Sequence, residues 1–296
     1  MLIRRMAPER GVQSGPLIEA LDVVEDGKPR LRACPEAVVI QPFDCRRKIW
    51  LRFGAVSRPN YGIDAPGVVT RLALVGIACV AAAIAFHVYA LVWSGATLIV
   101  TAALMVVSST WGKIRQREWL LDRVAWRGDE RVLDAGCGRG LFLCAAARRV
   151  PDGRVIGVDL WQAQDQTGNS SVATRANAAA EGVADRIDVM SGDLRALPFR
   201  DGTFDVVVSS LVVHNIPDAA GRALALCELV RVLAPGGRLL VQDIAHTRRY
   251  AAVLREAQLA SVRRGWPTIA MFPPTRPVEG IKQCSETEQK SRNMII

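Results

Sequence analysis

The chain of 296 residues predicts an α/β fold, with a doubly wound sheet preceded by a hairpin of two apolar helices. Two observations lead to this prediction. Between residues 131 and 243, short apolar runs that end in polar residues alternate with longer segments of helical periodicity, which is the order of β-α-β units. Upstream of them, the 41 residues 72–112 contain no Asp, Glu, Lys or Arg, and this length suits two helices.

A glycine-rich turn lies between the first apolar run and the helical segment that follows it. Residues 131–133 lead into Asp134, and glycines then stand at every second position, namely Gly136, Gly138 and Gly140. Glycine lets the backbone turn tightly and approach a ligand closely, and the N-terminus of the next helix offers free N–H groups to an anion. The turn therefore predicts a nucleotide-type site, although its spacing differs from the dinucleotide-binding pattern. The alternative is that the glycines serve only the turn.

Two further predicted strands end in acids that suit a nucleoside. Residues 154–159 end in Asp159, 19 residues after Gly140, where a carboxylate can accept both hydroxyls of a ribose. Residues 187–193 end in Asp193, which either accepts the exocyclic amine of adenine or caps the following turn. The remaining elements of this stretch are a strand at 203–210, a helix at 219–233, a Pro-Gly-Gly turn at 235–237 and a strand at 238–243.

This ordered set resembles the class I S-adenosylmethionine-dependent methyltransferases over about residues 113–283. The acid-x-Gly-x-Gly-x-Gly motif of that family falls on residues 134–140, its ribose-binding acid on Asp159 and its adenine-contacting acid on Asp193. Its strand-four motif and its Pro-Gly-Gly turn fall on Phe204, Asp205, Pro235, Gly236 and Gly237.

The resemblance implies a Rossmann-like sheet of seven strands whose last pair, here 260–266 and 276–282, is antiparallel. It also implies S-adenosylmethionine as the cofactor, bound outside the carboxyl ends of the strands. We read Cys137 as a small filler between glycines and not as a nucleophile. The residues expected to bind the cofactor are Asp134, Gly136, Cys137, Gly138, Gly140, Asp159, Leu160, Asp193, Leu194 and Ser209.

The acceptor is expected next to residues 209–215, which follow the fourth strand. His214 is the candidate catalytic base or substrate hydrogen-bond donor, and the alternative is that it caps the next helix or bonds the backbone. His246 is a second candidate. The long polar loop 160–170 is expected to fold over the cofactor as a lid, in which Trp161 either stacks on adenine or packs within the loop.

Composition limits the partners of the chain. The net charge of +9 suits nucleic acid, but the strand-four segment lacks the Asn/Asp-Pro-Pro-aromatic motif of the family's amino-methylating DNA and RNA enzymes. No Cys for cytosine chemistry lies near it either, so we expect a small-molecule acceptor and no nucleic acid. The seven cysteines form no C-x-x-C pair, which indicates free thiols in a reducing compartment and neither a disulfide framework nor a metal site.

The uncharged stretch predicts a transmembrane hairpin. Residues 72–93 would form a helix of about 33 Å, which matches a hydrocarbon core of roughly 30 Å. Residues 94–96 are the predicted turn, and residues 97–111 form a second segment that is short for a span. His87 is expected near the end of the first span. The alternative is a buried helical hairpin in a soluble core.

Basic residues flank the hairpin on both sides, and two spans place both flanks on one side of the membrane. The positive-inside rule makes that side the cytoplasm, so the expected location is the cell membrane, with the catalytic domain facing the cytoplasm. A helix at 114–127 is expected to join the hairpin to the first strand and to cover an edge of the sheet. The predicted organisation is a poorly ordered segment 1–57, a lead-in and hairpin 58–112, a methyltransferase domain 113–283 and a disordered tail 284–296.

These patterns together predict a membrane-anchored methyltransferase that acts on a small, membrane-partitioned molecule such as a lipid or a quinone. Two alternatives belong to other classes. One is a membrane-tethered module that binds S-adenosylmethionine without catalysis, and the other is a nicotinamide-dependent oxidoreductase, against which the glycine spacing and the Gly192-Asp193 pair argue.

Overall fold

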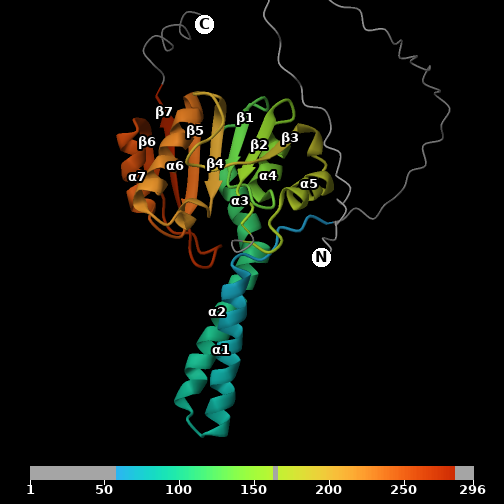
Figure 1. Ribbon diagram of the computed structural model, residues 1–296, viewed down its shortest axis with the longest axis vertical. Helices are drawn as coiled ribbons and strands as arrows, with labels where there is room; N and C mark the ends of the chain where they lie inside the picture. The colour runs from blue at the N-terminus through green and yellow to red at the C-terminus, as the bar shows by residue number, and fades with distance from the viewer. Residues whose placement is uncertain (1–57, 163–165, 284–296) are drawn as a thin grey trace, which may run out of the picture. The chain divides into compact units, whose positions relative to one another are not determined.

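The computed structural model describes residues 58–162 and 166–283, so the predictions for 1–57 and 284–296 lie outside the described residues. The domain after the hairpin is built on one seven-stranded sheet of order β3-β2-β1-β4-β5-β7-β6 (Figure 1). Strands β1 to β5 are parallel, and β7 is antiparallel to both β5 and β6. The predicted fold class is thereby confirmed. The strands are β1 Arg131–Ala135, β2 Arg154–Asp159, β3 Ile187–Ser191, β4 Phe204–Ser210, β5 Leu233–Asp243, β6 Leu259–Arg264 and β7 Arg276–Lys282.

Helices cover both faces of the sheet, because successive side chains of a strand point to opposite faces. In β1, Val132 packs with α3 and α4, whereas the next residue, Leu133, packs with α6 and α7. The same alternation occurs in β5, where Leu239 and Leu240 belong to opposite clusters. The helices of this domain are α3 Lys113–Leu121, α4 Leu141–Arg149, α5 Ser171–Ala180, α6 Ala219–Val232 and α7 Thr247–Glu256, with short 3₁₀ turns at Ala184–Arg186 and Val213–Asn215.

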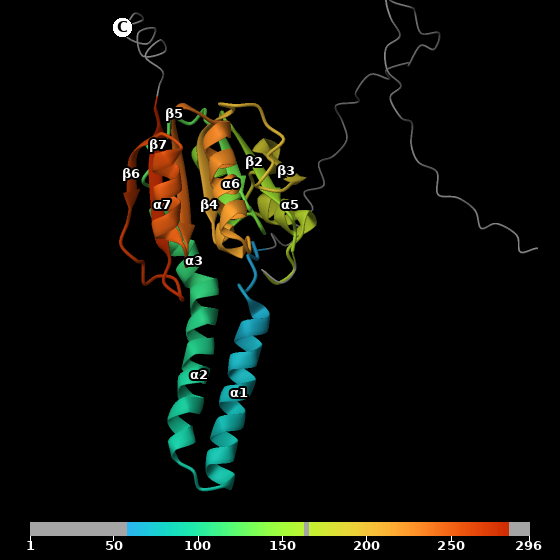
Figure 2. The same cartoon turned by 60° about the vertical axis from the view of Figure 1, so that its left-hand side comes forward.

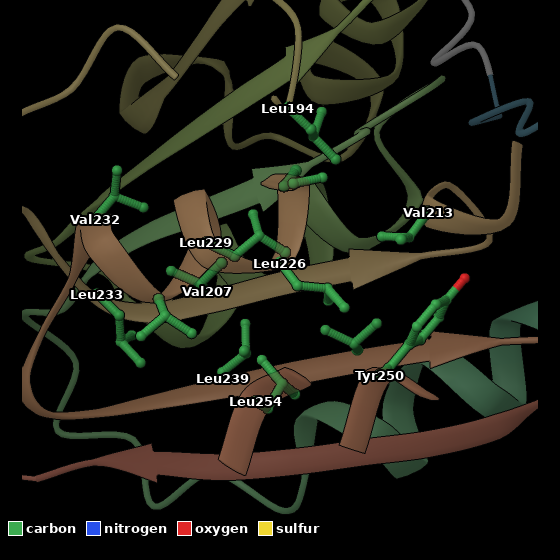
Figure 3. Packing of buried hydrophobic residues seen from close by; sticks show 14 of the residues in the cluster. Leu194, Val207, Val213, Leu226, Leu229, Val232, Leu233, Leu239, Tyr250 and Leu254 are labelled. Carbon is green, nitrogen blue, oxygen red and sulfur yellow. The ribbon is translucent and has the colours of Figure 1, made fainter. Parts of the chain in front are cut away.

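The core under α6 and α7 holds the sheet rigid behind the site (Figure 3). Leu226 and Leu229 of α6 and Leu254 of α7 are fully buried against Val207 and Leu239 of the sheet. Full burial of one such side chain contributes about 1.5–3 kcal/mol, and truncating a buried leucine to alanine costs about 2–5 kcal/mol. The strand ends that carry the functional side chains are therefore fixed by this packing.

The apolar stretch folds into two helices, α1 Pro66–Ala85 and α2 Ala90–Val107, that lie side by side (Figures 1 and 2). Both are long and apolar enough to cross a membrane, and only 11% of the residues in each apolar window are buried. The core helix of a soluble protein has the same composition but is mostly buried. The exposure of these helices therefore disfavours the alternative of a buried hairpin.

The predicted turn at 94–96 is wrong, because the chain reverses between Ala85 and Ala90. Gly95 lies inside α2, where its missing side chain allows close contact between the helices. A Cβ at Gly95 would lie 2.7 Å from the carbonyl oxygen of Gly76 on α1. Small residues at such crossings let helix backbones approach. His87 lies in the reversal itself, with a positive φ of 56°.

The linking helix differs from its prediction in length and in place. A π-helical turn, Ser108–Gly112, joins α2 to α3, which ends at Leu121 instead of 127. Leu120 and Leu121 belong to the buried cluster that covers one face of strands β1 to β5, and Gln116 of α3 donates to Gln242 of β5, so α3 lies on the face of the sheet and not at an edge. The physical reason is that both leucines are fully buried on the face of the sheet. The edges of the sheet are formed by β3 and β6.

Candidate active site

A cavity of about 410 Å³ opens at the carboxyl ends of the parallel strands. Its size falls within the range of roughly 300–1,000 Å³ that is typical of small-molecule sites, and it lies where the strand order reverses between β1 and β4. Among the ten predicted cofactor residues, Gly140 and Ser209 are not part of its lining. The predicted residues that line it are Asp134, Gly136, Cys137, Gly138, Asp159, Leu160, Asp193, Leu194 and His214.

The glycine turn requires glycine for two separate reasons. Gly136, Gly138 and Gly140 all have positive φ angles, of 80°, 49° and 83°. A Cβ at Gly136 would also lie 2.2 Å from Cγ2 of Val212. Gly140 stands at the start of α4, where it shapes the turn without reaching the cavity.

Asp134 places a buried carboxyl at the bottom of the turn. Its pKa is raised to about 7, mainly by burial and in small part by the nearby Asp159 charge, while the backbone N–H of Leu143 opposes the shift. Its Oδ2 has no hydrogen-bond partner within the described residues. A buried acceptor without a partner is costly, so a cationic or N–H group of a ligand would stabilise it.

Asp159 ends β2 and faces the same cavity. Its Oδ2 accepts the N–H of Gly138 at 2.8 Å, and its Oδ1 accepts the N–H of Trp161 at 2.6 Å. Asn169 adds a third bond to Oδ1 at 3.3 Å. The carboxylate is thus held between the glycine turn and the loop after β2.

Asp193 caps the turn that follows β3, as one of its two predicted alternatives has it. Its Oδ1 accepts the N–H of Arg195 at 2.9 Å, as a capping residue does, and the Arg195 guanidinium holds the pKa of this carboxyl below its usual value. The residue also lines the cavity. Trp161 does not line it, and its indole N–H donates instead to Oγ of Ser191 at 2.8 Å. For Trp161 this geometry favours packing over stacking.

His214 lies in the 3₁₀ turn after β4 and is fixed by Asp243, a residue that sequence reasoning missed. Its backbone N–H donates to Oδ2 of Asp243 at 2.9 Å, and its Nδ1 lies 2.5 Å from Oδ1 of the same carboxylate, as a close ionic contact whose angle does not make it a hydrogen bond. Asp243 is fully buried at the end of β5 and also accepts the hydroxyl of Tyr250 at 3.2 Å. A carboxylate beside Nδ1 favours the tautomer that leaves Nε2 as an acceptor. His246 is not part of the cavity lining.

The lead-in predicted before the hairpin docks on the catalytic domain through residues 58–64. Arg139 of the glycine turn donates to the carbonyl of Asn60 at 2.7 Å, and Asn177 of α5 donates to the same oxygen at 2.9 Å. Gln166, in the loop after β2, bonds both the carbonyl of Tyr61 and the N–H of Arg139. The lead-in and this loop therefore close over the glycine turn together.

Lys113 connects the lead-in to the hairpin. Its Nζ donates to the carbonyls of Tyr61 and Gly62 at 2.8 and 2.7 Å and pairs with Asp64 at 3.1 Å. Burial lowers the pKa of Lys113, and the Asp64 carboxylate opposes that shift. No local pattern marks Lys113 among the many basic residues of the flank, so sequence reasoning passed over it.

The cavity has two walls. The strand-end residues described above form the cofactor wall. The hairpin wall comes from the base of the hairpin and from the β6–β7 loop, and Ser108 ties these two segments together because its Oγ accepts the N–H of Phe272 at 2.8 Å. The residues of the hairpin wall are Ala65, Met105, Ser108, Ser109, Met271, Phe272 and Pro273.

Residues 133–241 match the family model described as a methyltransferase domain. With the sheet order and the site geometry, this match identifies the region as a class I S-adenosylmethionine-dependent methyltransferase domain. Among solved structures, the [4+2]-cyclase SpnF shares the fold at a TM-score of 0.50 and 18% identity, covering 58% of this chain and 82% of that one. The likeness to SpnF concerns the fold alone.

Curated relatives carry names from quinone biosynthesis. The ubiquinone/menaquinone biosynthesis C-methyltransferase UbiE of Dinoroseobacter shibae is 35% identical over 132 residues, which are 44% of this chain and 48% of that protein. The demethylmenaquinone methyltransferase of Symbiobacterium thermophilum is 38% identical over 116 residues, 39% of this chain and 43% of that protein. The chain spans about half the length of these curated relatives.

The residues present fit S-adenosylmethionine, the cofactor of this class. Two carboxylates, Asp134 and Asp159, line the cavity beside the glycine turn, and the Gly138 N–H of that turn donates to Asp159. The unpartnered oxygen of Asp134 suits the ammonium group of the cofactor, and Asp159 suits its ribose hydroxyls. No group of three or more His, Cys, Asp or Glu that could hold a metal occurs among the described residues.

Proposed function

We propose that this protein is a membrane-anchored, S-adenosylmethionine-dependent methyltransferase whose acceptor is a small, membrane-partitioned molecule such as a quinone or a lipid. One observation carries the proposal: a single cavity is lined both by the carboxylates of the cofactor wall and by the base of an apolar, exposed hairpin. An acceptor in that cavity lies between the cofactor site and the end of the hairpin.

The residues of the chain bind the cofactor, orient the acceptor and exclude water from the site. When bound, S-adenosylmethionine supplies a methyl group that is already activated by the sulfonium charge, so the protein mainly aligns the reactants. Asp134, Asp159 and the glycine turn hold the cofactor, and the lead-in covers the turn from outside. His214 accepts a proton at Nε2 when the acceptor carries one, with Asp243 orienting the ring.

The relatives support a quinone-type acceptor, because two of them are named as methyltransferases of ubiquinone or menaquinone biosynthesis. The segment that matches the family model, residues 133–241, contains the cofactor wall but not the hairpin base. The fold by itself does not select the reaction, since a cyclase shares it. The acceptor therefore has to be argued from the cavity and tested directly.

The hairpin supports a membrane location. It has two helices of 20 and 18 residues, or about 30 and 27 Å, and most of its apolar side chains are exposed. Basic residues stand at its domain-side ends, with Arg71 in α1 and Lys113 and Arg115 after α2. By the positive-inside rule, two spans with positive flanks support a cytoplasmic position for the methyltransferase domain.

Calorimetric titration of S-adenosylmethionine into the detergent-solubilised chain tests the cofactor site. We expect binding by the intact protein, a loss of binding in Asp159→Ala and no change in Asp188→Ala, which removes an exposed carboxylate of β3 outside the cavity lining. Equal binding by both variants would contradict the assigned site, and no binding by the intact protein would overturn the methyltransferase proposal.

A transfer assay with a radiolabelled methyl group on membrane lipid extracts tests the acceptor. Label that enters the organic phase, and does so less in His214→Gln, supports a membrane-partitioned acceptor. Label that enters only water-soluble acceptors overturns that class. Cofactor binding without any transfer to either pool would leave the chain as a tethered binding module.

A further inference from the structure

The β6–β7 loop exposes two large apolar side chains that the proposed reaction does not use. Trp266 is 89% exposed and Ile269 is 95% exposed, on a segment of eleven residues between β6 and β7. Single exposed apolar residues are ordinary on soluble proteins. A tryptophan and an isoleucine that are both almost fully exposed on one short loop need a partner with an apolar surface.

Three arginines surround this loop at the same edge of the sheet, and we call them the arginine cluster. Arg264 ends β6, Arg276 begins β7 and Arg248 lies in the first turn of α7. Burial and the neighbouring charges of Arg276 and Arg248 lower the pKa of Arg264. Nowhere in residues 58–162 and 166–283 does a carboxylate form an ion pair with any of the three, so this positive charge is not compensated.

The loop is docked at the point where the uncharged hairpin ends. A Cβ at Gly112 would lie 1.9 Å from the carbonyl oxygen of Ala270, so the loop backbone rests directly on the π-helical turn. Trp111, beside it, is 76% exposed, and the first charge after the hairpin is Lys113. Figures 1 and 2 both show the β6–β7 loop next to the junction of α2 and α3.

We infer that the β6–β7 loop and the arginine cluster form an interfacial membrane-binding surface that seats on anionic lipid headgroups, with Trp266 and Ile269 entering the interface. The inference rests on the proposed membrane location of the hairpin. Tryptophan prefers the headgroup region, and clustered arginines are attracted to the negative potential of anionic leaflets. Continuity with the end of the hairpin selects a bilayer over a soluble protein as the partner.

This surface has a consequence for the acceptor. The inner side of the same loop, Met271 to Pro273, belongs to the hairpin wall of the cavity. When the loop binds the bilayer, the hairpin wall lies at the level of the lipid headgroups. The polar group of an amphipathic molecule lies at the same depth. The inferred acceptor is therefore one whose reactive ring or headgroup lies at the membrane interface.

Fluorescence quenching by lipids with brominated acyl chains tests the inference on the full chain in vesicles. The difference between the intact protein and Trp266→Phe isolates the signal of Trp266, and Trp93→Phe does the same for α2, where Trp93 is 79% exposed. The vesicles contain phosphatidylcholine alone or with phosphatidylglycerol. We expect quenching of Trp266 that increases about twofold or more when anionic lipid is present.

A matched pair of charge variants tests the arginine cluster. Replacing Arg248, Arg264 and Arg276 by Gln should remove the increase caused by anionic lipid. Replacing Arg131, Arg154 and Arg200 by Gln should leave the increase caused by anionic lipid unchanged, because these residues lie at the opposite ends of the strands. Equal losses in the two triple variants would overturn the role of the cluster.

The Trp266 signal decides the inference independently of the hairpin. An unquenched Trp266 in both lipid mixtures overturns the inferred surface and indicates a protein partner or none, even if Trp93 is quenched. A quenched Trp266 with an unquenched Trp93 supports the surface and overturns the membrane location of the hairpin.

Discussion

The two walls of the cavity are built in different ways. Residues of the cofactor wall lie in the last two residues of β1 and β2 or within a few residues after β1 to β4, so each is placed by the strand that carries or precedes it. The hairpin wall joins residues 65, 105, 108, 109 and 271–273, which meet only through contacts across long stretches of sequence, such as the bond from Phe272 to Ser108. Cofactor binding should therefore depend on local backbone geometry, and acceptor access on long-range docking.

The largest expected effect comes from breaking the cofactor wall at Gly136. In Gly136→Val the new side chain would collide with Val212 and would require a strained positive φ. We expect cofactor affinity to fall by about 100-fold or more, because the turn cannot keep its backbone N–H groups in place. Calorimetry measures this loss, and Gly67→Ala, where a Cβ meets nothing within 4 Å, is the matched control. Retained affinity in Gly136→Val would show that the turn is not the cofactor site.

A smaller effect is expected from Asp243→Asn, which disturbs the chemistry while leaving the cofactor wall intact. Asparagine keeps the size of Asp243 but cannot hold His214 in the same tautomer. We expect kcat to fall by roughly 100-fold, in the range of a lost general base, with an unchanged cofactor Kd. The double variant with His214→Gln should be no slower than either single variant, because both changes remove one function. Additive losses would contradict the coupling.

The Lys113→Met variant tests the contact between the lead-in and the base of the hairpin. It removes three hydrogen bonds to the lead-in but retains a long apolar side chain. The lead-in should loosen, and cofactor affinity should fall by about tenfold, in line with the loss of charge-assisted hydrogen bonds. Arg115→Met, an exposed change two residues away, should have no effect. An unchanged cofactor Kd in Lys113→Met would show that the lead-in does not close the cofactor wall.

The last expected effect concerns stability instead of binding or rate, and is a pH dependence that originates at Asp134. Burial raises the pKa of this carboxyl to about 7, whereas an exposed aspartate has a pKa of about 3.9. Between these values the folded state holds the proton more often than the unfolded state, so stability falls as pH rises from about 4 to about 7. Asp134→Asn should remove this slope, and Asp188→Asn should preserve it.

Thermal melting of the three proteins between about pH 4 and pH 8 measures the slope. A steeper fall for the intact chain than for Asp134→Asn supports the buried carboxyl. Parallel curves for these two proteins would show that Asp134 is solvated in the folded state.

Much of the catalytic domain could be predicted from its sequence, because its signals are local. The glycine turn, the acids at the ends of β2 and β3 and the antiparallel last pair were all predicted, and the sheet order bears out the fold. The hairpin was predicted as an apolar pair of helices, but its turn was misplaced because Gly95 was taken as a turn residue. A glycine at a helix crossing and a glycine in a turn look alike in one sequence.

What the sequence alone determined was the set of strands and the residues at their carboxyl ends, because a parallel sheet brings such positions to one edge whatever surrounds them. Only the tertiary structure decided which residues act together across the chain. Asp243 meets His214 because β4 and β5 are neighbours. Lys113 meets Asp64 because the lead-in docks beside the hairpin. These pairs form through packing between distant segments, and no local periodicity encodes such contacts.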